Sequence, residues 1–421
     1  MPISVTLSVM IKSHKKNIFE SLGRNPVHPF PARMSPGIAL EALNKPGPRL
    51  RVLDPMMGSG TVLAVARSFG HRAIGVDLDP LAVLISKVWT TSIDPEAVTR
   101  RGALVLQRAR QHFVNMGTRE SYPTHANEET KEFLRFWFDD YARRQLAALA
   151  RAINRVHDLD ERNVLWCAFS RLIITKKVGA SLAMDLSHSR PHKSFRLAPL
   201  KPLTKFTDAL NTVIANVPQK GSGPIGPSVT TLRGDARDLR IKSGSIDLVL
   251  TSPPYLNAID YMRCSKFSLV WMGYSLDEIR VLRSTSIGSE VSLSEMESTT
   301  IVKEVVKEMK LSPPLNNHNL AIFSRYVKDM HTAIGEVARV LAQNGRAIYV
   351  VGNSSVRGTF VKNSAVVEAV AKRNGLQLTE KRIRLLPPNR RYLPPPSFRS
   401  AGPALGTRMR QEVVLAFGHA C

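Results

Sequence analysis

Two short apolar runs near the start of the chain are separated by a turn and a segment of helical character. Residues 50–54 and 73–77 are rich in aliphatic and β-branched side chains, which is typical of buried strands. The residues between them, from about 62 to 69, are predicted to form a helix that ends at Gly70, and Pro80 opens a second helix. Strand, helix, strand and helix at this spacing predict a parallel, doubly wound sheet.

The hydrophobic pattern changes between residues 96 and 225. Leu146, Leu149 and Ile153 recur at helical spacing within a segment rich in arginine and alanine. This part of the chain is therefore predicted to be a mostly helical insertion that interrupts the sheet.

Strand-like runs return after the insertion. We expect strands at residues 246–250 and 345–351, and a closing antiparallel pair at residues 376–386 and 412–417. The predicted fold class is α/β, with a doubly wound Rossmann-like sheet, a closing antiparallel strand pair and a helical insertion.

Composition adds a possible class of partner. The chain of 421 residues carries 59 Lys+Arg against 34 Asp+Glu, a formal net charge of +25. Such a surplus is a common footprint of nucleic-acid binding, although a solvated basic surface would give the same count. Three widely spaced cysteines imply no disulfide framework, and no apolar run approaches 18 residues. These features predict a cytoplasmic protein with no membrane segment.

The first strand ends in a glycine-rich turn, DPMMGSGT, at residues 54–61. Glycines let the backbone approach a ligand closely, and the following helix offers unpaired N–H donors. Asp77 ends the next strand, where such folds place an acid to hold a ribose diol. A nucleotide-type ligand is predicted, with a tight turn that binds nothing as the alternative. A dinucleotide is disfavoured because no third glycine follows Gly60 at the required spacing.

DPMMGSGT followed by GVDLDP resembles the S-adenosylmethionine site of the amino-methyltransferases of restriction–modification systems. The resemblance implies that the loop residues line the methionine part and that the acid after the second strand binds the ribose hydroxyls. HPFPARM, residues 28–34, resembles the family's segment over the cofactor, and GDAR, residues 234–237, resembles its acid near the adenine amino group. The implied cofactor-binding residues are Phe30, Arg33, Asp54, Gly58, Gly60, Thr61, Asp77 and Asp235.

A second motif, TSPPY, follows the predicted strand at residues 246–250. Prolines fix the backbone and donate no N–H, so their carbonyls can be directed into a site. An exocyclic amine is a poor nucleophile because its lone pair is delocalised into the base. Two acceptors that hold its hydrogens would free that lone pair, and an aromatic ring would stack on an extruded base. A rigid proline turn that only caps the strand is the alternative.

TSPPY also resembles the catalytic tetrapeptide of the same family. The resemblance implies that Ser252 holds the amine, that Pro253 and Pro254 supply the carbonyl and rigid backbone, and that Tyr255 stacks on the base. The serine form preceded by threonine is the one associated with cytosine N4. Adenine N6 is the close alternative because the loop chemistry is shared.

Other chemistries fit the sequence less well. Cytosine C5 methylation needs a cysteine next to a proline, and none of the three cysteines follows one. His188 and His192 lie four apart, but Pro191 lies between them and no acid completes a metal site, so no metal is predicted.

Two acid-free basic stretches are candidates for DNA contacts. Residues 189–206, predicted to be extended because of their prolines, include Arg190, Lys193 and Arg196. Residues 381–411 include Arg390 and Arg391. Solvated loops are the alternative for both. Bases could be recognised by the insertion or by the Ser/Thr-rich residues 284–300.

The sequence is thus predicted to divide into a cofactor-binding half (residues 1–95), a mostly helical insertion that is a candidate for DNA contacts (96–225) and a catalytic half (226–421). The predicted protein uses S-adenosylmethionine and no metal to methylate double-stranded DNA, and a cognate restriction endonuclease is a candidate partner. An RNA methyltransferase and a catalytically silent, basic DNA-binding protein are the rival hypotheses.

Overall fold

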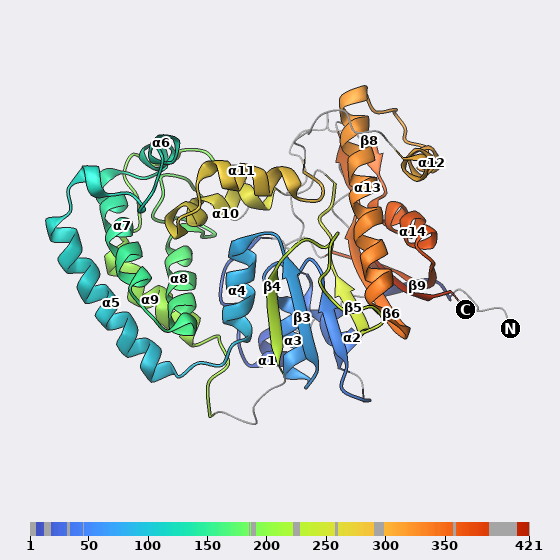
Figure 1. Ribbon diagram of the computed structural model, residues 1–421, viewed down its shortest axis with the longest axis horizontal. Helices are drawn as coiled ribbons and strands as arrows, with labels where there is room; N and C mark the ends of the chain where they lie inside the picture. Colours follow the sequence, from blue (N-terminus) through green and yellow to red (C-terminus); the bar gives the residue numbers. More distant parts are fainter. Residues whose placement is uncertain are drawn as a thin grey trace.

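The computed structural model describes residues 6–11, 18–31, 34–44, 46–184, 186, 191–221, 228–256, 260–289, 299–356, 359–386 and 411–420. Its centre is an eight-stranded sheet with the order β1-β9-β10-β6-β5-β2-β3-β4 (Figure 1). Neighbouring strands pair in parallel except that β10 runs antiparallel to both β6 and β9. This order and the reversed β10 confirm the predicted doubly wound sheet with its closing antiparallel pair.

The strands of the main sheet vary from four to twelve residues. Their bounds are β1 Thr6–Ile11, β2 Arg51–Asp54, β3 Arg72–Asp77, β4 Val229–Arg233, β5 Ile246–Thr251, β6 Leu341–Gly352, β9 Leu376–Leu385 and β10 Gln411–His419. A separate hairpin pairs β7, Ser354–Val356, with β8, Thr359–Val361.

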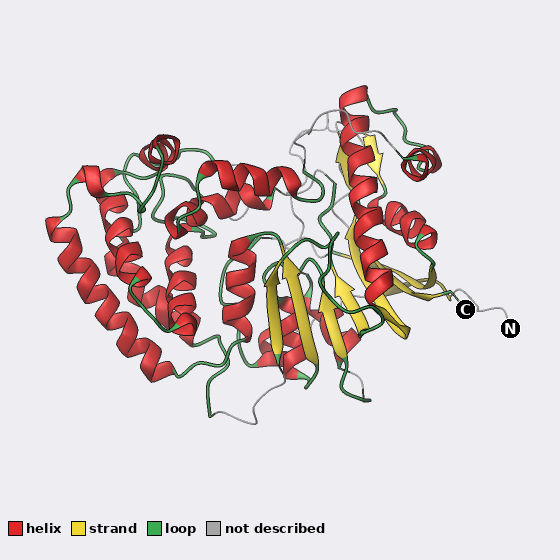
Figure 2. Cartoon of the chain, viewed as in Figure 1, coloured by secondary structure: helices red, strands yellow, loops and turns green. Residues whose placement is uncertain are grey.

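Alternate residues of the central strands enter two different apolar cores. Val52, Leu248 and Leu250 pack in one core with α2, Pro36–Leu43, and α3, Thr61–Ser68. Their neighbours Leu53 and Val249 pack in the other, together with α12, Thr300–Glu308, α13, Asn317–Val340, and α14, Asn363–Arg373. Because successive strand residues point to opposite faces, a sheet with both faces buried needs such continuous apolar runs. The sheet is therefore the middle of three layers (Figure 2).

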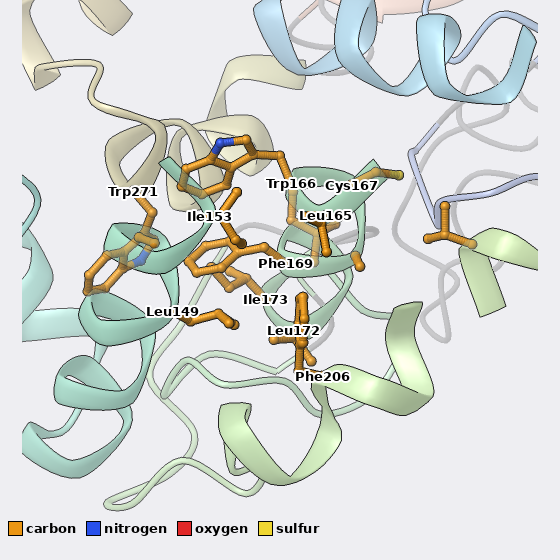
Figure 3. Close-up of a cluster of buried hydrophobic side chains, with 14 of the residues drawn as sticks. Leu149, Ile153, Leu165, Trp166, Cys167, Phe169, Leu172, Ile173, Phe206 and Trp271 are labelled. Atoms are coloured by element: carbon orange, nitrogen blue, oxygen red, sulfur yellow. The ribbon is translucent and has the colours of Figure 1, made fainter. Parts of the chain in front are cut away.

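The helical part of the chain lies beyond the β4 edge of the sheet (Figure 1). It is formed by α5 Pro95–Asn115, α6 Glu128–Trp137, α7 Asp140–Asn154, α8 Leu159–Ile173 and α9 Pro202–Ile214, with the short 3₁₀ turn η1 Thr118–Glu120. Leu149 and Ile153 of α7 meet Leu165 and Phe169 of α8 in its core (Figure 3). The helical spacing of apolar residues is explained by this burial.

Four further elements connect the two parts. They are α1 Ile18–Leu22, α4 Pro80–Thr90, α10 Tyr261–Leu269, which continues into the 3₁₀ turn η2 Val270–Met272, and α11 Leu276–Thr285. Trp271 of η2 is buried in the helical core together with Phe169 (Figure 3). The segment after the predicted catalytic loop is therefore anchored in the helical part of the molecule.

Two local expectations differ from the structure. The strand β4 was not predicted, because it lies at the sheet edge and all five of its side chains are only partly buried or exposed. Residues 189–206 were expected to be extended, but α9 begins at Pro202. Proline is compatible with the first turn of a helix, where its missing N–H has no partner to lose.

Among the described residues, no helix is both long enough and apolar enough to span a bilayer.

Candidate active site

The predicted motifs meet where the strand order reverses. From β2 the chain moves outward to β3 and β4, and then returns to the other side of β2 to form β5. In parallel α/β sheets, ligands bind outside the carboxyl ends of the strands at such a switch point. Asp54 ends β2, Asp77 ends β3 and Thr251 ends β5. The predicted cofactor turn and the predicted catalytic loop are therefore neighbours at one edge of the sheet.

The glycine turn needs glycine for two different reasons. Gly58 and Gly60 have φ values of 49° and 81°, in the left-handed region that strains other residues. A Cβ on Gly60 would also lie 2.7 Å from the hydroxyl oxygen of Ser86 on α4. That hydroxyl donates a hydrogen bond of 2.8 Å to the carbonyl of Gly58. The turn is thus held against α4, and Thr61 begins α3 immediately after it.

Asp77 is held by the turn that it faces. Its carboxylate accepts hydrogen bonds from the backbone N–H of Gly58 at 2.8 Å and of Asp79 at 2.9 Å. Burial and the nearby charge of Asp79 raise the pKa of Asp77 to about 7. The side chain remains partly exposed, so its free lone pairs are available to the hydroxyl groups of a ligand.

Asp54 is buried and joins the two motifs. Its carboxylate accepts a hydrogen bond of 2.7 Å from the hydroxyl of Thr251 and one of 3.2 Å from the N–H of Met56. Burial raises the pKa of Asp54 to about 7. The contact with Thr251 spans 197 positions in the sequence. In the sequence, Thr251 was noted only as part of the TSPPY motif, and no local pattern identified it as the hydrogen-bond partner of Asp54.

The hydroxyl of Ser252 is oriented by the neighbouring strand. It donates a hydrogen bond of 3.1 Å to the carbonyl of Val350 on β6 and lies 3.3 Å from the phenolic oxygen of Tyr255. Since a hydroxyl has one proton, this donation leaves the oxygen of Ser252 as an acceptor. Pro253 is buried and Pro254 partly buried. The oxygen of Ser252 can therefore accept a hydrogen bond from a donor group of a substrate.

The ring of Tyr255 lies directly against the backbone of β6. A Cβ on Gly352 would lie 2.6 Å from the Cε2 atom of this ring, so only glycine leaves room for it. Burial, together with the charge of Glu412, raises the pKa of Tyr255 and keeps the phenol neutral. The role of Gly352 could not be predicted from the sequence, because it depends on Tyr255, nearly a hundred positions away.

An aromatic pair lies beside the glycine turn. The rings of Phe30 and Tyr261 are nearly parallel, 2° apart, with centroids 6.0 Å from each other. Phe30 is buried, and its Cε1 atom would be 3.8 Å from a Cβ on Gly58. Tyr261 begins α10, whose Ser265 donates a hydrogen bond of 2.5 Å to Asp79. The structure thus brings the predicted Phe30 to the predicted turn and adds Tyr261, which sequence reasoning did not select.

Asp235 follows β4 at the same edge of the sheet, and its carboxylate is engaged. Arg237 donates to it from Nε at 3.0 Å and from Nη2 at 2.6 Å, and the backbone N–H of Arg237 adds a bond of 2.9 Å. Nε also lies 3.2 Å from the second oxygen, so three N–H groups of Arg237 engage both oxygens of Asp235. A carboxylate has about four acceptor positions, which leaves about one for a ligand amine. Asp235 is linked to β3 because Gly234 donates to the carbonyl of Asp77 at 3.1 Å.

The predicted DNA contacts are only partly described. Lys193 and Arg196 are exposed, and Nζ of Lys193 lies 5.1 Å from the ring centroid of Phe136 on α6. Arg33, Arg190, Arg390 and Arg391 lie outside the described residues, as does His188. Within the described part of the chain, no group of three or more His, Cys, Asp or Glu side chains could hold a metal ion.

Comparison with known proteins finds methyltransferases. The chain is 23% identical to the type II methyltransferase M.MvaI of Kocuria varians, over 92% of this chain and 89% of that protein. It is 22% identical to the type II methyltransferase M.AvaI of Nostoc sp., over 80% of this chain and 75% of the relative. No protein-family model matches the chain. The predicted resemblance to methyltransferases of restriction–modification type is confirmed by these relatives.

Among solved structures, a TehB-like SAM-dependent methyltransferase from Corynebacterium glutamicum aligns with a TM-score of 0.28 and 11% identity, covering 91% of this chain and 86% of that one.

Proposed function

We propose that this chain is a DNA methyltransferase that moves a methyl group from S-adenosylmethionine to the exocyclic amine of a flipped-out base, with cytosine N4 as the favoured target. The observation that carries the proposal is the junction of the two motifs. Thr251, which precedes the SPPY loop, bonds at 2.7 Å to Asp54, which precedes the glycine turn. A methyl donor on the turn and an amine on the loop would therefore meet.

The loop has the acceptors that an aromatic amine requires. The hydroxyl of Ser252 donates its only hydrogen bond to the carbonyl of Val350, so its oxygen can accept a hydrogen bond from the amine. The backbone carbonyl of Pro253 is the proposed second acceptor, held by a ring that fixes φ. Two such acceptors draw the nitrogen toward a tetrahedral geometry and expose its lone pair. The ring of Tyr255 is the proposed stacking surface for the extruded base.

The residues around the glycine turn fit the proposed cofactor. When bound, S-adenosylmethionine supplies an electrophilic methyl group. The partly exposed carboxylate of Asp77 suits two ribose hydroxyls, and the partly exposed backbone of Gly58 suits close approach of the methionine part, with Asp54 and Thr61 beside it. Phe30 would cover the same turn, and Asp235 would accept from the adenine amine. Arg33 stays a proposal by resemblance alone.

Cytosine N4 is favoured over adenine N6 because of the Thr-Ser form of the loop. Double-stranded DNA is the proposed partner, contacted by Lys193 and Arg196 and by Arg190, Arg390 and Arg391. Cytoplasmic localisation and pairing with a cognate restriction endonuclease belong to the same proposal. The relatives named above are type II methyltransferases, which supports modification of DNA over a silent DNA-binding role.

The nucleoside that receives the methyl group tests this proposal. Unmethylated genomic DNA and, in a parallel reaction, RNA are incubated with the chain and methyl-labelled S-adenosylmethionine, digested to nucleosides and analysed. We expect labelled N4-methylcytosine. Labelled N6-methyladenine would overturn the base assignment, and transfer to RNA alone would overturn the DNA assignment. DNA binding without transfer would support the silent alternative.

The variant Ser252→Ala tests the role of the loop in the same assay. Loss of one acceptor to a developing charge costs about 1.5–3 kcal/mol, which lowers kcat roughly 10- to 150-fold. Equal rates for the parent and a folded Ser252→Ala variant would show that the loop is only a proline turn.

A further inference from the structure

Arg237 connects three separate elements through one guanidinium group. It donates to Asp235 after β4, to Asp329 of α13 at 2.6 Å and to the carbonyl of Thr285 at the end of α11, also at 2.6 Å. Its side chain and that of Asp329 are largely buried, at 20% and 10% exposure. Removal of a partner from such a network leaves a buried charge unpaired, so the arrangement is strongly specified.

The end of α11 is held by a second arginine as well. Arg325 of α13 donates to the carbonyl of Ser284, and its Nε lies 3.7 Å from Asp329. The last carbonyls of a helix have no partner within the helix, and basic side chains satisfy them favourably. Arg237 and Arg325 therefore hold the carbonyls of the last two residues of α11.

The turn that follows α11 lies against the proposed catalytic loop. Ile287 is buried in the same core as Leu256 of that loop. A Cβ on Gly288 would lie 3.5 Å from the carbonyl oxygen of Tyr255 and 3.8 Å from Cβ of Pro254. A displacement at the end of α11 would thus reach the backbone that carries the base-stacking ring.

We propose that Arg237 is a positioning residue that couples the cofactor's adenine end to the turn over the catalytic loop, so that cofactor and DNA bind cooperatively. This inference rests on the proposed function, in which Asp235 accepts from the adenine amine. A ligand amine that donates to Asp235 shares that carboxylate with Arg237. The amine thereby orients the carboxylate and, through it, the guanidinium group of Arg237. The same guanidinium then holds Thr285 and the turn at Tyr255 in the arrangement that receives the base.

A lysine cannot replace this connection. The planar guanidinium presents a fixed fork of donors that meets three partners at once, whereas an ammonium group is a point charge on a flexible stem. Arg237→Lys keeps the charge beside Asp235 and Asp329 but loses the bridge to Thr285.

Arg339 of α13 offers a matched control, because it holds the loop that follows Arg237. It ties residues 239–243 to α13, donating to the carbonyl of Leu239 at 2.7 Å and to that of Ile241 at 2.9 Å, and it pairs with Glu336. None of the contacts recorded for Arg339 involves Asp235 or α11. Arg339→Lys therefore weakens the loop without touching the proposed coupling.

The experiment measures binding of a short duplex that the chain methylates, with and without saturating S-adenosylhomocysteine. The parent protein should bind the duplex more tightly when S-adenosylhomocysteine is present. The ratio of the two affinities should fall within the roughly 5- to 150-fold range typical of coupled sites. Arg237→Lys should bring that ratio close to 1, while Arg339→Lys keeps it. Asp329→Asn, which retains the shape of its side chain, should lower the ratio as well and serves if Arg237→Lys does not fold.

Three outcomes would overturn the coupling. They are an unchanged ratio in folded Arg237→Lys and Asp329→Asn, an equal loss in Arg339→Lys, and a parent that methylates DNA with a ratio of 1. A parent that binds no S-adenosylhomocysteine or methylates no DNA would instead overturn the proposed function.

Discussion

Asp54 and Asp77 are carboxyl groups whose charge is disfavoured by their surroundings. Burial raises the pKa of each to about 7, from an ordinary value of 3.8. Because the folded-state values are raised, ionisation of these groups destabilises the fold as the pH rises from 3.8 toward 7. Hydroxyl donors from a ligand favour the charged form, so ligand binding and deprotonation of Asp77 support each other.

Cofactor affinity should therefore depend on pH through Asp77. Below the pKa of about 7 the protonated acid loses acceptor capacity, and affinity for S-adenosylhomocysteine should fall by up to about tenfold per pH unit between pH 7 and pH 5.5. Calorimetric titration at several pH values measures this. Asp77→Asn should bind weakly with a flatter profile, and any remaining slope reports Asp54. A profile in Asp77→Asn that parallels the parent would remove Asp77 from the site.

The residues that sequence could predict are those whose signal is local. Gly58, Asp77 and Ser252 belong to short motifs that each follow a strand. The groups that hold them are distant in sequence, as Val350 is from Ser252 and Gly352 is from Tyr255. A close approach between two such segments leaves no local pattern, so only the folded structure identifies these partners.

At the scale of elements, β2 and β5 act as one unit. They pair in parallel, with Val52 opposite Leu248 and Leu53 opposite Val249. The Thr251–Asp54 bond closes the same pair at its carboxyl end, inside the protein. A buried hydrogen bond between strand ends restrains the distance between the two loops that follow. One loop carries the proposed site of the methyl donor, and the other carries the proposed site of the base that accepts the methyl group.

Thr251→Val should separate this link from side-chain volume. The substitution keeps the shape but leaves Asp54 with one fewer donor, at a cost of about 1–3 kcal/mol in the free energy of unfolding. The pKa of Asp54 should rise further, and methyl transfer should slow. Thr251→Ser, which retains the hydroxyl, is the control. Denaturant unfolding and single-turnover transfer measure both variants, and a Thr251→Val protein as stable and fast as Thr251→Ser would contradict the link.

Element prediction succeeded where one physical pattern dominated. Strands β2, β3 and β5 are buried on both faces and appear as continuous apolar runs. Edge strand β4 has the sequence VTTLR and little burial, so hydrophobic pattern could not distinguish it from a loop. The start of α9 was missed because proline was weighed as a helix breaker, although it is favoured in the first turn.

At the scale of the whole molecule, charge is the feature that the core does not explain. The formal net charge of +25 exceeds what solubility requires, and Lys193 and Arg196 are exposed members of it. Phosphate contacts release counterions, so each one steepens the dependence of DNA affinity on salt.

Replacing Lys193 and Arg196 together by glutamine should make the slope of log affinity against log salt shallower by about two units. Arg108 and Arg110 are exposed residues of α5, a helix at the outer side of the helical part (Figure 1), and they provide a control with the same loss of charge. Replacing them by glutamine should leave the slope nearly unchanged. DNA titrations from low to high salt measure both pairs, and equal slopes for the two double variants would assign Lys193 and Arg196 to a solvated loop.

The core shared by the helical part and the cofactor side limits how this molecule could have diverged. A single apolar cluster runs from Phe30 and the α4 residue Leu81 through α5, α7, α8 and α9 to Trp271, just after the proposed catalytic loop. The helices are thus not a cassette that recombination could exchange intact, because a foreign replacement would have to match side chains beside the cofactor turn. Divergence in what the protein recognises is easier to achieve by substitutions at the surface than by transplanting the insertion.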